Sequence, residues 1–310
     1  MSTIDVHQHL WPEALLAALA RRRRPPMIIR RGDGWTLRIH GEGEWPVDPR
    51  DHDPDRRAAL LDAHDVDRAL VAPSSPLGIE ALPADEAAPL LEAYHAGVAE
   101  LPARFGAWAA VGLAEPNPEA LAGLLDRGFV GACVAADALG EPSAVMALEP
   151  VLALLERRGA PLFVHPGPSP RTLHAERPTG APPWWPAMTR YVASMNAAWH
   201  AFGLVGRPAH PGLRVCFAML AGLAPLQRER LVARGGDPAT APLTFVDTSS
   251  YGVRAIDATI RELGVDALVH GSDVPVVPGR DPALGEAVRA AMRDRNPARL
   301  LSPATEEVFA

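Results

Sequence analysis

Short runs of apolar residues recur along the chain and alternate with longer segments in which apolar positions return every three to four residues. The short runs predict buried β-strands, and the longer segments predict amphipathic helices. Eight strands are predicted, at residues 4–9, 69–72, 106–112, 129–135, 161–165, 213–218, 243–247 and 267–271. Helical segments are predicted between most of them, at residues 54–64, 84–101, 117–127, 146–158, 187–204, 224–234 and 254–264, with a closing helix near 282–293.

This rhythm predicts an α/β fold, a (β/α)8 TIM barrel that forms a single domain over residues 1–310. The strands do not alternate between apolar and polar residues, as expected for parallel strands buried on both faces. Residues 25–54 break the rhythm, because two alternating runs, 27–31 and 35–40, flank a Gly-Asp-Gly turn and predict a small β-hairpin. This excursion follows the first strand, so we expect it to fold over the barrel mouth as a lid.

Polar residues stand at the C-terminal ends of three predicted strands. His7 and His9 lie in the first strand, so their side chains point to the same face, about 7 Å apart along the backbone. The fifth strand ends at His165, and Asp273 follows the eighth. In a barrel these ends meet at one mouth, whereas an open sheet gives no reason for polar residues at these three ends. We therefore expect a metal site there.

Composition and charge exclude several classes of partner. A net charge of -7 and a pI near 5.9 leave no basic surface for nucleic acid. No apolar run has the length of a membrane span and no signal-peptide pattern is present, so we expect a cytoplasmic protein.

Cys133 and Cys216 lie far apart in apolar runs and predict buried free thiols. The chain has no lysine, which excludes a Schiff base and a carboxylated-lysine bridge between two metal ions.

Four segments resemble those of a known family. They are Asp5-Val6-His7-Gln8-His9, Phe163-Val164-His165-Pro166-Gly167, Phe245-Val246-Asp247-Thr248-Ser249-Ser250 and His270-Gly271-Ser272-Asp273-Val274-Pro275. In this order and spacing the chain resembles the amidohydrolase superfamily, in the branch that contains 2-amino-3-carboxymuconate-6-semialdehyde decarboxylase and related aromatic-acid decarboxylases. The resemblance covers nearly the whole chain and implies a barrel enzyme that depends on a metal.

The resemblance also implies a ligand set of His7, His9, His165 and Asp273 around one divalent ion. Three imidazoles and one carboxylate favour zinc. Asp273 is the expected catalytic residue, because a carboxylate that touches both the metal and its water can take the remaining proton. The missing lysine argues against a second ion. So does the sixth strand, where this chain lacks a histidine that the family usually has.

The sixth strand departs from the family pattern. These enzymes usually have a histidine before a glycine pair, whereas this chain reads Phe217-Ala218-Met219-Leu220-Ala221-Gly222 and has Met219 at the histidine position. Methionine cannot transfer a proton. This weakens the usual decarboxylase mechanism and leaves the hydrolytic set of metal, water and aspartate intact. We expect Met219 to form an apolar floor of the substrate pocket.

Further substrate-binding candidates come from loops at the predicted mouth. Trp184 and Trp185 follow a Pro-rich run after the fifth strand, and we expect one of them to wall the pocket. Tyr251 follows the seventh strand and can reach the same space. Arg171 is a candidate carboxylate anchor, and His174 is the candidate replacement for the missing histidine.

These observations predict a mononuclear metal-dependent enzyme that hydrolyses an amide, lactone or C–C bond in a small cyclic or carboxylated molecule. Two alternatives stay open. One is a non-hydrolytic decarboxylase of an aromatic or unsaturated acid, and the other is a catalytically weakened barrel that binds a ligand. The expected partner is a small molecule, and a homodimer is compatible with the sequence.

Overall fold

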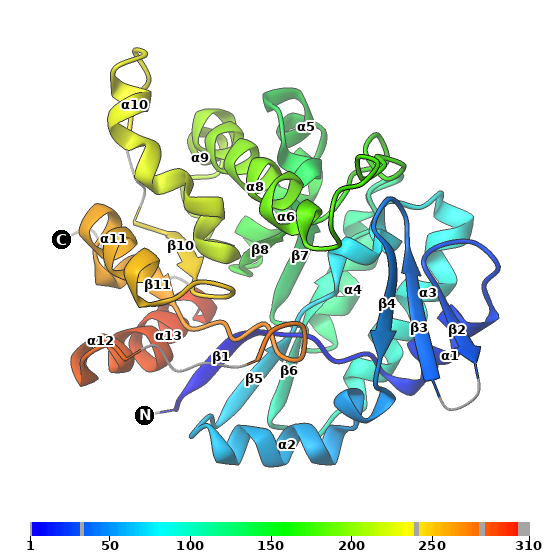
Figure 1. The fold of residues 1–310 in the computed structure, drawn as a ribbon. Coiled ribbons are helices and arrows are strands. Elements are labelled where there is room, and N and C mark those ends of the chain that lie inside the picture. The colour runs from blue at the N-terminus through cyan, green and yellow to red at the C-terminus, as the bar shows by residue number, and fades with distance from the viewer. Residues whose placement is uncertain (1, 32–33, 239–241, 279–282, 303–310) are drawn as a thin grey trace.

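The computed structural model describes residues 2–31, 34–238, 242–278 and 283–302. Eight parallel strands form the central sheet in the order β1-β5-β6-β7-β8-β9-β10-β11 (Figure 1). Their bounds are Ile4–Gln8 (β1), Arg68–Val71 (β5), Phe105–Ala110 (β6), Gly131–Ala135 (β7), Leu162–His165 (β8), Val215–Phe217 (β9), Thr244–Asp247 (β10) and Leu268–Val269 (β11). Each predicted apolar run forms one of these strands, which confirms the predicted TIM barrel.

Backbone hydrogen bonds between β1 and the segment around and after β11 close the barrel. Val6 N donates to His270 O at 2.9 Å, and His9 N donates to Val274 O at 2.8 Å. Between them, Asp273 N donates to His7 O at 2.9 Å. The ends of the first and eighth strands therefore lie side by side, although they are separated by almost the whole length of the sequence.

Helices cover the outside of the barrel (Figure 1). Their bounds are Glu13–Arg21 (α1), Pro54–Ala63 (α2), Ala84–Ala99 (α3), Pro118–Asp126 (α4), Pro142–Ala147 (α5), Glu149–Arg157 (α6), Trp185–Met188 (α7), Arg190–Ala201 (α8), Arg207–Ala209 (α9), Arg228–Val232 (α10), Val253–Leu263 (α11), Glu286–Ala290 (α12) and Asn296–Leu301 (α13). Within the described ranges, none of these helices combines the length and the apolar character that crossing a bilayer requires.

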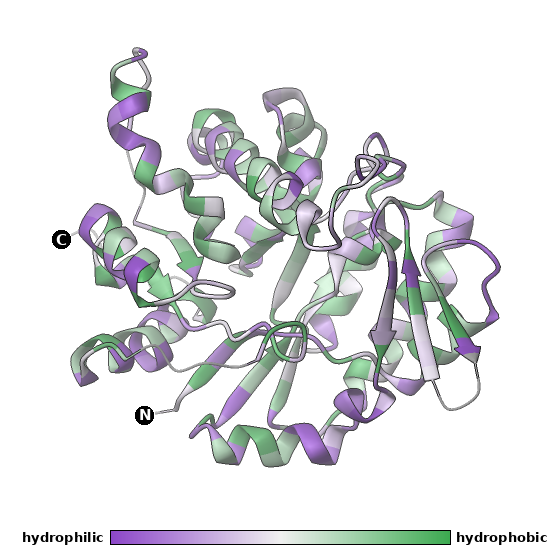
Figure 2. Cartoon of the chain, in the orientation of Figure 1, coloured by the Kyte–Doolittle hydropathy of each residue, from purple (hydrophilic) through white to green (hydrophobic). Residues whose placement is uncertain are grey.

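The barrel strands are apolar along most of their length, as the hydropathy colours show (Figure 2). Phe163, Phe217 and Phe245 on β8, β9 and β10 are fully buried. Trp108 on β6 is also fully buried, and its indole Nε1 donates to Val6 O at 2.9 Å, so the indole polar group is satisfied inside the core. Both cysteines are buried free thiols, as predicted.

The excursion after the first strand is a three-stranded antiparallel sheet, formed by β2 (Met27–Arg31), β3 (Gly34–Ile39) and β4 (Gly43–Val47). The hairpin prediction covered only two of these strands, and most of its Gly-Asp-Gly turn lies outside the described residues. The third strand was not predicted, because its Gly-Glu-Trp-Pro-Val sequence has neither clear alternation nor a β-rich composition. Pro46 is tolerated there because β4 is an edge strand of this sheet.

Candidate metal centre

Four side chains from three separate parts of the chain converge at the C-terminal end of the barrel. His7 lies on β1 and His9 directly after it, His165 ends β8, and Asp273 lies in the loop after β11. Each offers one ligand atom, and these atoms all lie within 4.8 Å of one another. All four residues are buried. The structure therefore brings together the four residues that the sequence indicated as ligands.

Each of the three imidazoles is oriented by a hydrogen bond from its Nδ1. His7 Nδ1 donates to Asp247 Oδ2 at 2.7 Å, and His9 Nδ1 donates to Ala72 O at 3.0 Å. His165 Nδ1 donates to Pro166 O at 2.8 Å. Because a carboxylate or carbonyl oxygen can only accept, each Nδ1 holds the ring hydrogen in the neutral form of its ring. Each Nε2 then presents a lone pair to the centre of the cluster.

This arrangement fits a divalent cation. The Nε2 atoms of His7 and His9 are 3.1 Å apart, which places two hydrogen-bond acceptors against each other when both rings are neutral. Asp273 Oδ1 lies 3.1 Å from His9 Nε2 and 3.6 Å from His7 Nε2, so a third acceptor faces the same space. Buried acceptors in mutual contact need a cation or a proton between them. Three imidazoles and one carboxylate are a donor set typical of a zinc site.

The pKa shifts within the cluster follow from burial and from the neighbouring charges. Burial opposes the charged form of His7, but Asp247, Asp273 and Asp5 outweigh it and raise the pKa of His7. Burial, together with His7 and His9, holds the pKa of His165 well below its usual value, so this ring is neutral. Burial opposes ionisation of Asp273, yet the surrounding histidines lower its pKa to about 2. Asp273 is therefore a carboxylate at neutral pH.

Asp247 at the end of β10 is a functional residue to which the sequence analysis assigned no role. Its Oδ2 accepts from His7, while its Oδ1 accepts from the backbone N of Met219 and Ser249, both at 2.9 Å. It is completely buried. A Cβ at Gly271 would lie 2.9 Å from Asp247 Cγ, so only glycine lets the eighth strand approach this closely. In the sequence, the only indication of this role was that Asp247 ends a predicted strand, as the candidate ligand His165 does.

Strained backbone is concentrated at the same rim. Met219, Ser250 and Asp273, which follow β9, β10 and β11, have φ values of 53°, 64° and 60°. This left-handed region costs a non-glycine residue roughly 1–2 kcal/mol. All three residues line the same cavity, so left-handed backbone occurs at three of the strand ends that form it.

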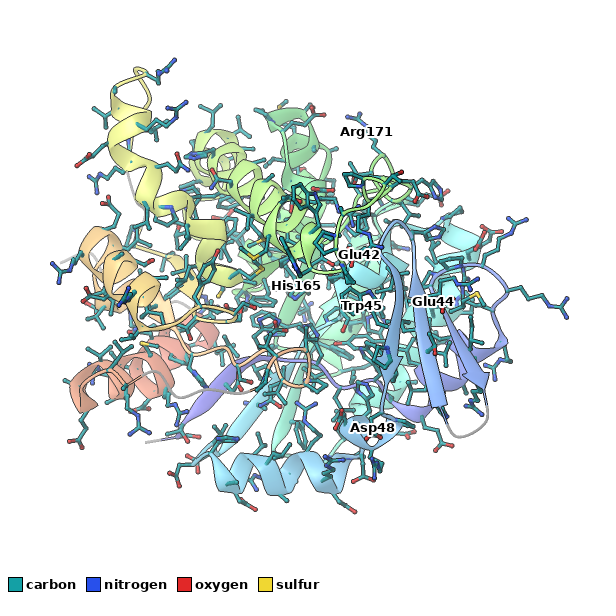
Figure 3. The ribbon with its side chains drawn as sticks, viewed as in Figure 1. Glu42, Glu44, Trp45, Asp48, His165 and Arg171 are labelled. Carbon is teal, nitrogen blue, oxygen red and sulfur yellow. The ribbon has the colours of Figure 1, made fainter. Side chains whose placement is uncertain are left out.

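The cavity has a volume of about 560 Å³ and contains the four-residue cluster at its base. One wall is the three-stranded sheet, which contributes Leu37, Ile39 and Trp45. Figure 3 shows Trp45 on the side of this sheet that faces the barrel, with His165 near the barrel centre. Residues of the sheet thus line the same cavity as the four-residue cluster at the C-terminal end of the barrel.

A buried ion-pair cluster fastens the sheet to the barrel. Glu42, in the β3–β4 turn, is only 6% exposed. Its Oε1 accepts from Arg190 Nη2 and from the Tyr191 hydroxyl, both at 2.6 Å, and both donors belong to α8. Beside it, Arg177 N donates to Gly41 O at 3.0 Å. The sheet is therefore held in place over the cavity by charge-assisted bonds.

Several predicted substrate-binding residues line this cavity. Trp184, Met219 and Tyr251 are among them. Trp185 is adjacent to Trp184 but does not belong to the lining. Of the two tryptophans, Trp184 therefore lines the cavity.

Two predicted residues lie elsewhere. The side chain of Arg171 is 82% exposed and pairs with Glu141 at 2.7 Å, and Figure 3 shows it at the periphery, so it is not a carboxylate anchor. His174 is exposed and packs edge-on against His40 with ring centroids 4.9 Å apart, so it does not replace the missing histidine. Both errors have one cause: the loop after β8 has no periodic pattern from which side-chain directions can be predicted.

Comparisons with known proteins match this geometry at the level of fold. No family model matches the sequence, and no curated protein does. The solved 5-carboxyvanillate decarboxylase LigW from Sphingomonas paucimobilis has a TM-score of 0.71 at 18% identity, over 98% of this chain and 100% of that chain. A putative amidohydrolase from Staphylococcus aureus has a TM-score of 0.69 at 16% identity, over 97% and 99% of the two chains. This chain therefore shares its fold with these two proteins.

A third solved structure contains a metal. A variant of the 5-carboxyvanillate decarboxylase LigW2 from Novosphingobium aromaticivorans, with bound manganese and 3-methoxy-4-hydroxy-5-nitrobenzoic acid, has a TM-score of 0.63 at 18% identity. It matches over 79% of this chain and 80% of that chain. The neighbours thus include decarboxylases and amidohydrolases, as the resemblance predicted. The fold accommodates both reactions, so the choice between them depends on the residues of the site.

Proposed function

We propose that the chain is a mononuclear metal-dependent hydrolase that opens an amide or lactone bond in a small cyclic substrate. The observation that supports this most directly is the content of the cavity. It combines four converging ligand groups with Met219 at the position of the family's acid–base histidine. Hydrolysis needs one carboxylate beside an activated water, and Asp273 is that carboxylate.

We propose zinc as the ion, held by His7, His9, His165 and Asp273. One ion is proposed because the chain has no lysine to bridge a second one and because Met219 supplies no further imidazole. A divalent ion held by these residues would supply water with a lowered pKa and would polarise the bond to be cleaved. The hydrogen bonds from Nδ1 of the three histidines hold their rings in the tautomer that binding requires.

Asp273 moves the proton in this proposal. Its Oδ1 faces His9, whereas its Oδ2 lies 3.3 Å from the Ser250 hydroxyl, on the side of the cavity. Oδ2 takes the proton from the attacking water and returns it to the leaving nitrogen or oxygen. The Ser250 hydroxyl, which donates to this oxygen, helps to hold the carboxylate in position.

The alternative reaction is decarboxylation, the activity for which the two 5-carboxyvanillate decarboxylases among the neighbours are named. A decarboxylase must place a proton on the carbon atom that loses the carboxyl group. Met219 cannot donate one, and His174 lies outside the cavity lining. The site therefore favours hydrolysis.

We further propose that the three-stranded sheet acts as a fixed lid within a single-domain enzyme. Its side chains supply one wall of the cavity, and Glu42 ties it to α8. The sheet would determine which substrates fit, while the barrel rim would supply the chemistry.

A substrate screen with two variants tests the function. The zinc-loaded protein is incubated with lactones, cyclic amides and aromatic acids, and product masses are measured. We expect ring-opened products from lactones or amides. Asp273→Asn should lose turnover by roughly 10²- to 10⁴-fold. Met219→Leu should have nearly unchanged turnover, because the substitution conserves volume. Release of carbon dioxide from an aromatic acid, with no hydrolysis of any lactone or amide, would show that the assignment is wrong.

A further inference from the structure

The charged groups that line the cavity are all of one sign, apart from its histidines. They are the carboxylates of Glu42, Asp48, Asp51 and Asp273. The chain contains no lysine, and no arginine belongs to the lining within the residues that the structure describes. A substrate carboxylate that enters this space meets no guanidinium or ammonium partner from the described lining.

Arginines close in the sequence to the lining residues are bound to other groups. Arg38 pairs with Glu44, and Arg50 pairs with the lining residue Asp48 at 2.7 Å, so neither adds an unpaired cation to the cavity. Arg190 and Arg57 are also bound. Arg190 uses both terminal nitrogens, one for Glu42 at 2.6 Å and the other for Ala175 O at 2.9 Å. Arg57 is buried and donates to His9 O at 2.6 Å and Val274 O at 3.1 Å. These bonds connect the end of β1 to the loop after β11, and Arg57 does not belong to the cavity lining. Neither guanidinium is available to a ligand without the loss of these bonds.

His52 does not supply the missing positive charge. Its Nδ1 accepts from Trp11 N at 3.1 Å, and its ring stacks on the Trp11 indole with centroids 4.4 Å apart. Burial, followed by the charge of Arg57 and by His9, lowers the pKa of His52 to about 3. This histidine therefore presents an uncharged ring to the cavity.

The remaining walls are suited to flat apolar groups. Trp11, Trp45, Trp184, Tyr191 and Tyr251 contribute aromatic rings from five different places in the sequence. Aromatic walls favour ring-shaped ligands through offset stacking and edge contacts. A volume of about 560 Å³ is within the range of sites that hold a small organic molecule.

We infer that the substrate of this site is an electrically neutral, ring-bearing acyl compound, such as an aryl lactone or cyclic amide without a carboxylate. The inference rests on the proposed hydrolytic function for the acyl bond, but its charge selectivity follows from the protein groups of the cavity and is separate from any coordination to the proposed zinc ion. An ion buried without a partner is strongly disfavoured relative to a neutral group of the same shape. We expect a selectivity of about 100-fold against a carboxylate on the ring, which corresponds to about 2.8 kcal/mol.

The test measures binding of a matched pair of probes by calorimetry. 2-Naphthamide and 2-naphthoate have the same ring and differ in charge, and both are titrated into the zinc-loaded and the metal-free protein. In the metal-free protein the naphthoate cannot gain affinity by coordinating zinc, so this form isolates the charge of the cavity. We expect naphthamide to bind about 100-fold more tightly there.

A charge-insertion variant makes the test specific to this cavity. Met188 lines the cavity at its rim and is 63% exposed, so Met188→Arg should be tolerated and should strengthen naphthoate binding at least tenfold. The matched control is Met146→Arg, at a methionine on α5 that is 61% exposed and outside the lining. This control should change neither affinity.

The outcomes separate the inference from the proposed function. Equal or tighter binding of naphthoate by the metal-free wild type would overturn the inference, and so would binding of neither probe. A preference for naphthamide that vanishes in Met188→Arg but persists in Met146→Arg would support it. Failure of the zinc-loaded protein to hydrolyse any neutral lactone or amide would refute the hydrolase proposal, while the binding ratio would still report the charge preference.

Discussion

Replacing Asp247 by asparagine should weaken zinc binding although Asp247 is not one of the four ligands. Its Oδ1 accepts from the backbone of Met219 and Ser249, and those two donors require an oxygen. In Asp247→Asn the amide oxygen must therefore stay on that side, and the amide NH2 faces His7 Nδ1. Two donors then meet, so His7 is driven to carry its hydrogen on Nε2, where the lone pair for the metal is needed.

The magnitude follows from the bond that is lost. The hydrogen bond from His7 Nδ1 to Asp247 Oδ2 is 2.7 Å long, buried and charge-assisted. Hydrogen bonds to charged groups contribute about 1.5–3 kcal/mol. At about 1.4 kcal/mol for each factor of ten, we expect zinc affinity to fall roughly 10- to 100-fold. The wild type should retain one equivalent of zinc after dialysis.

Competition with a chromophoric zinc chelator measures this change, and circular dichroism verifies that the variant folds. Asp126→Asn is the control, because Asp126 is an exposed aspartate that pairs with Arg158 on the outer surface. Nitrogen NMR of the metal-free protein should show the His7 hydrogen on Nδ1 in the wild type and on Nε2 in Asp247→Asn. An unchanged zinc affinity together with an unchanged tautomer would refute the reasoning.

Two further predictions concern the lid and the strained rim. Glu42→Gln should increase hydrogen exchange in β3 and β4 roughly tenfold without affecting the barrel strands, because it weakens the bonds to Arg190 and Tyr191. Exchange mass spectrometry measures this, and Glu44→Gln, at an exposed position on the same sheet, is the control. Equal exchange in the two variants would contradict the prediction. Ser250→Gly should be more stable than Ser250→Ala by about 1 kcal/mol, because both lose the hydroxyl but only glycine tolerates a φ of 64° without strain. Urea denaturation compares the pair, and an alanine variant at least as stable as the glycine variant would show that this position is not strained.

The barrel could be predicted from the sequence because its strands are buried on both faces and therefore appear as continuous apolar runs. The convergence of the four candidate ligands could be predicted for a related reason. His7, His165 and Asp273 interrupt or follow such runs at strand ends, and barrel closure brings those ends together. In both cases a local pattern is enough, because the fold determines where each strand end lies.

Other features depend on contacts that no local pattern encodes. The direction of Arg171 is determined by Glu141, which is 30 residues away and belongs to a different loop. The role of Asp247 depends on its contact with His7 across 240 positions. Strand β4 forms because β3 offers it a partner, and its own sequence has little strand character. Side-chain directions in long loops and pairings of edge strands are therefore the features that required the structure.

The three-stranded sheet has a consequence for how this protein can be altered. Its strands pair only with one another, so their ladder is separate from that of the barrel. Leu37, Ile39 and Trp45 line the cavity from this sheet, while the four proposed metal ligands belong to the barrel rim. These three cavity-lining positions can thus vary without a change in any of the four proposed ligands. Randomising these three positions should yield a library in which most members still fold and retain metal, so that selection acts almost entirely on the choice of substrate.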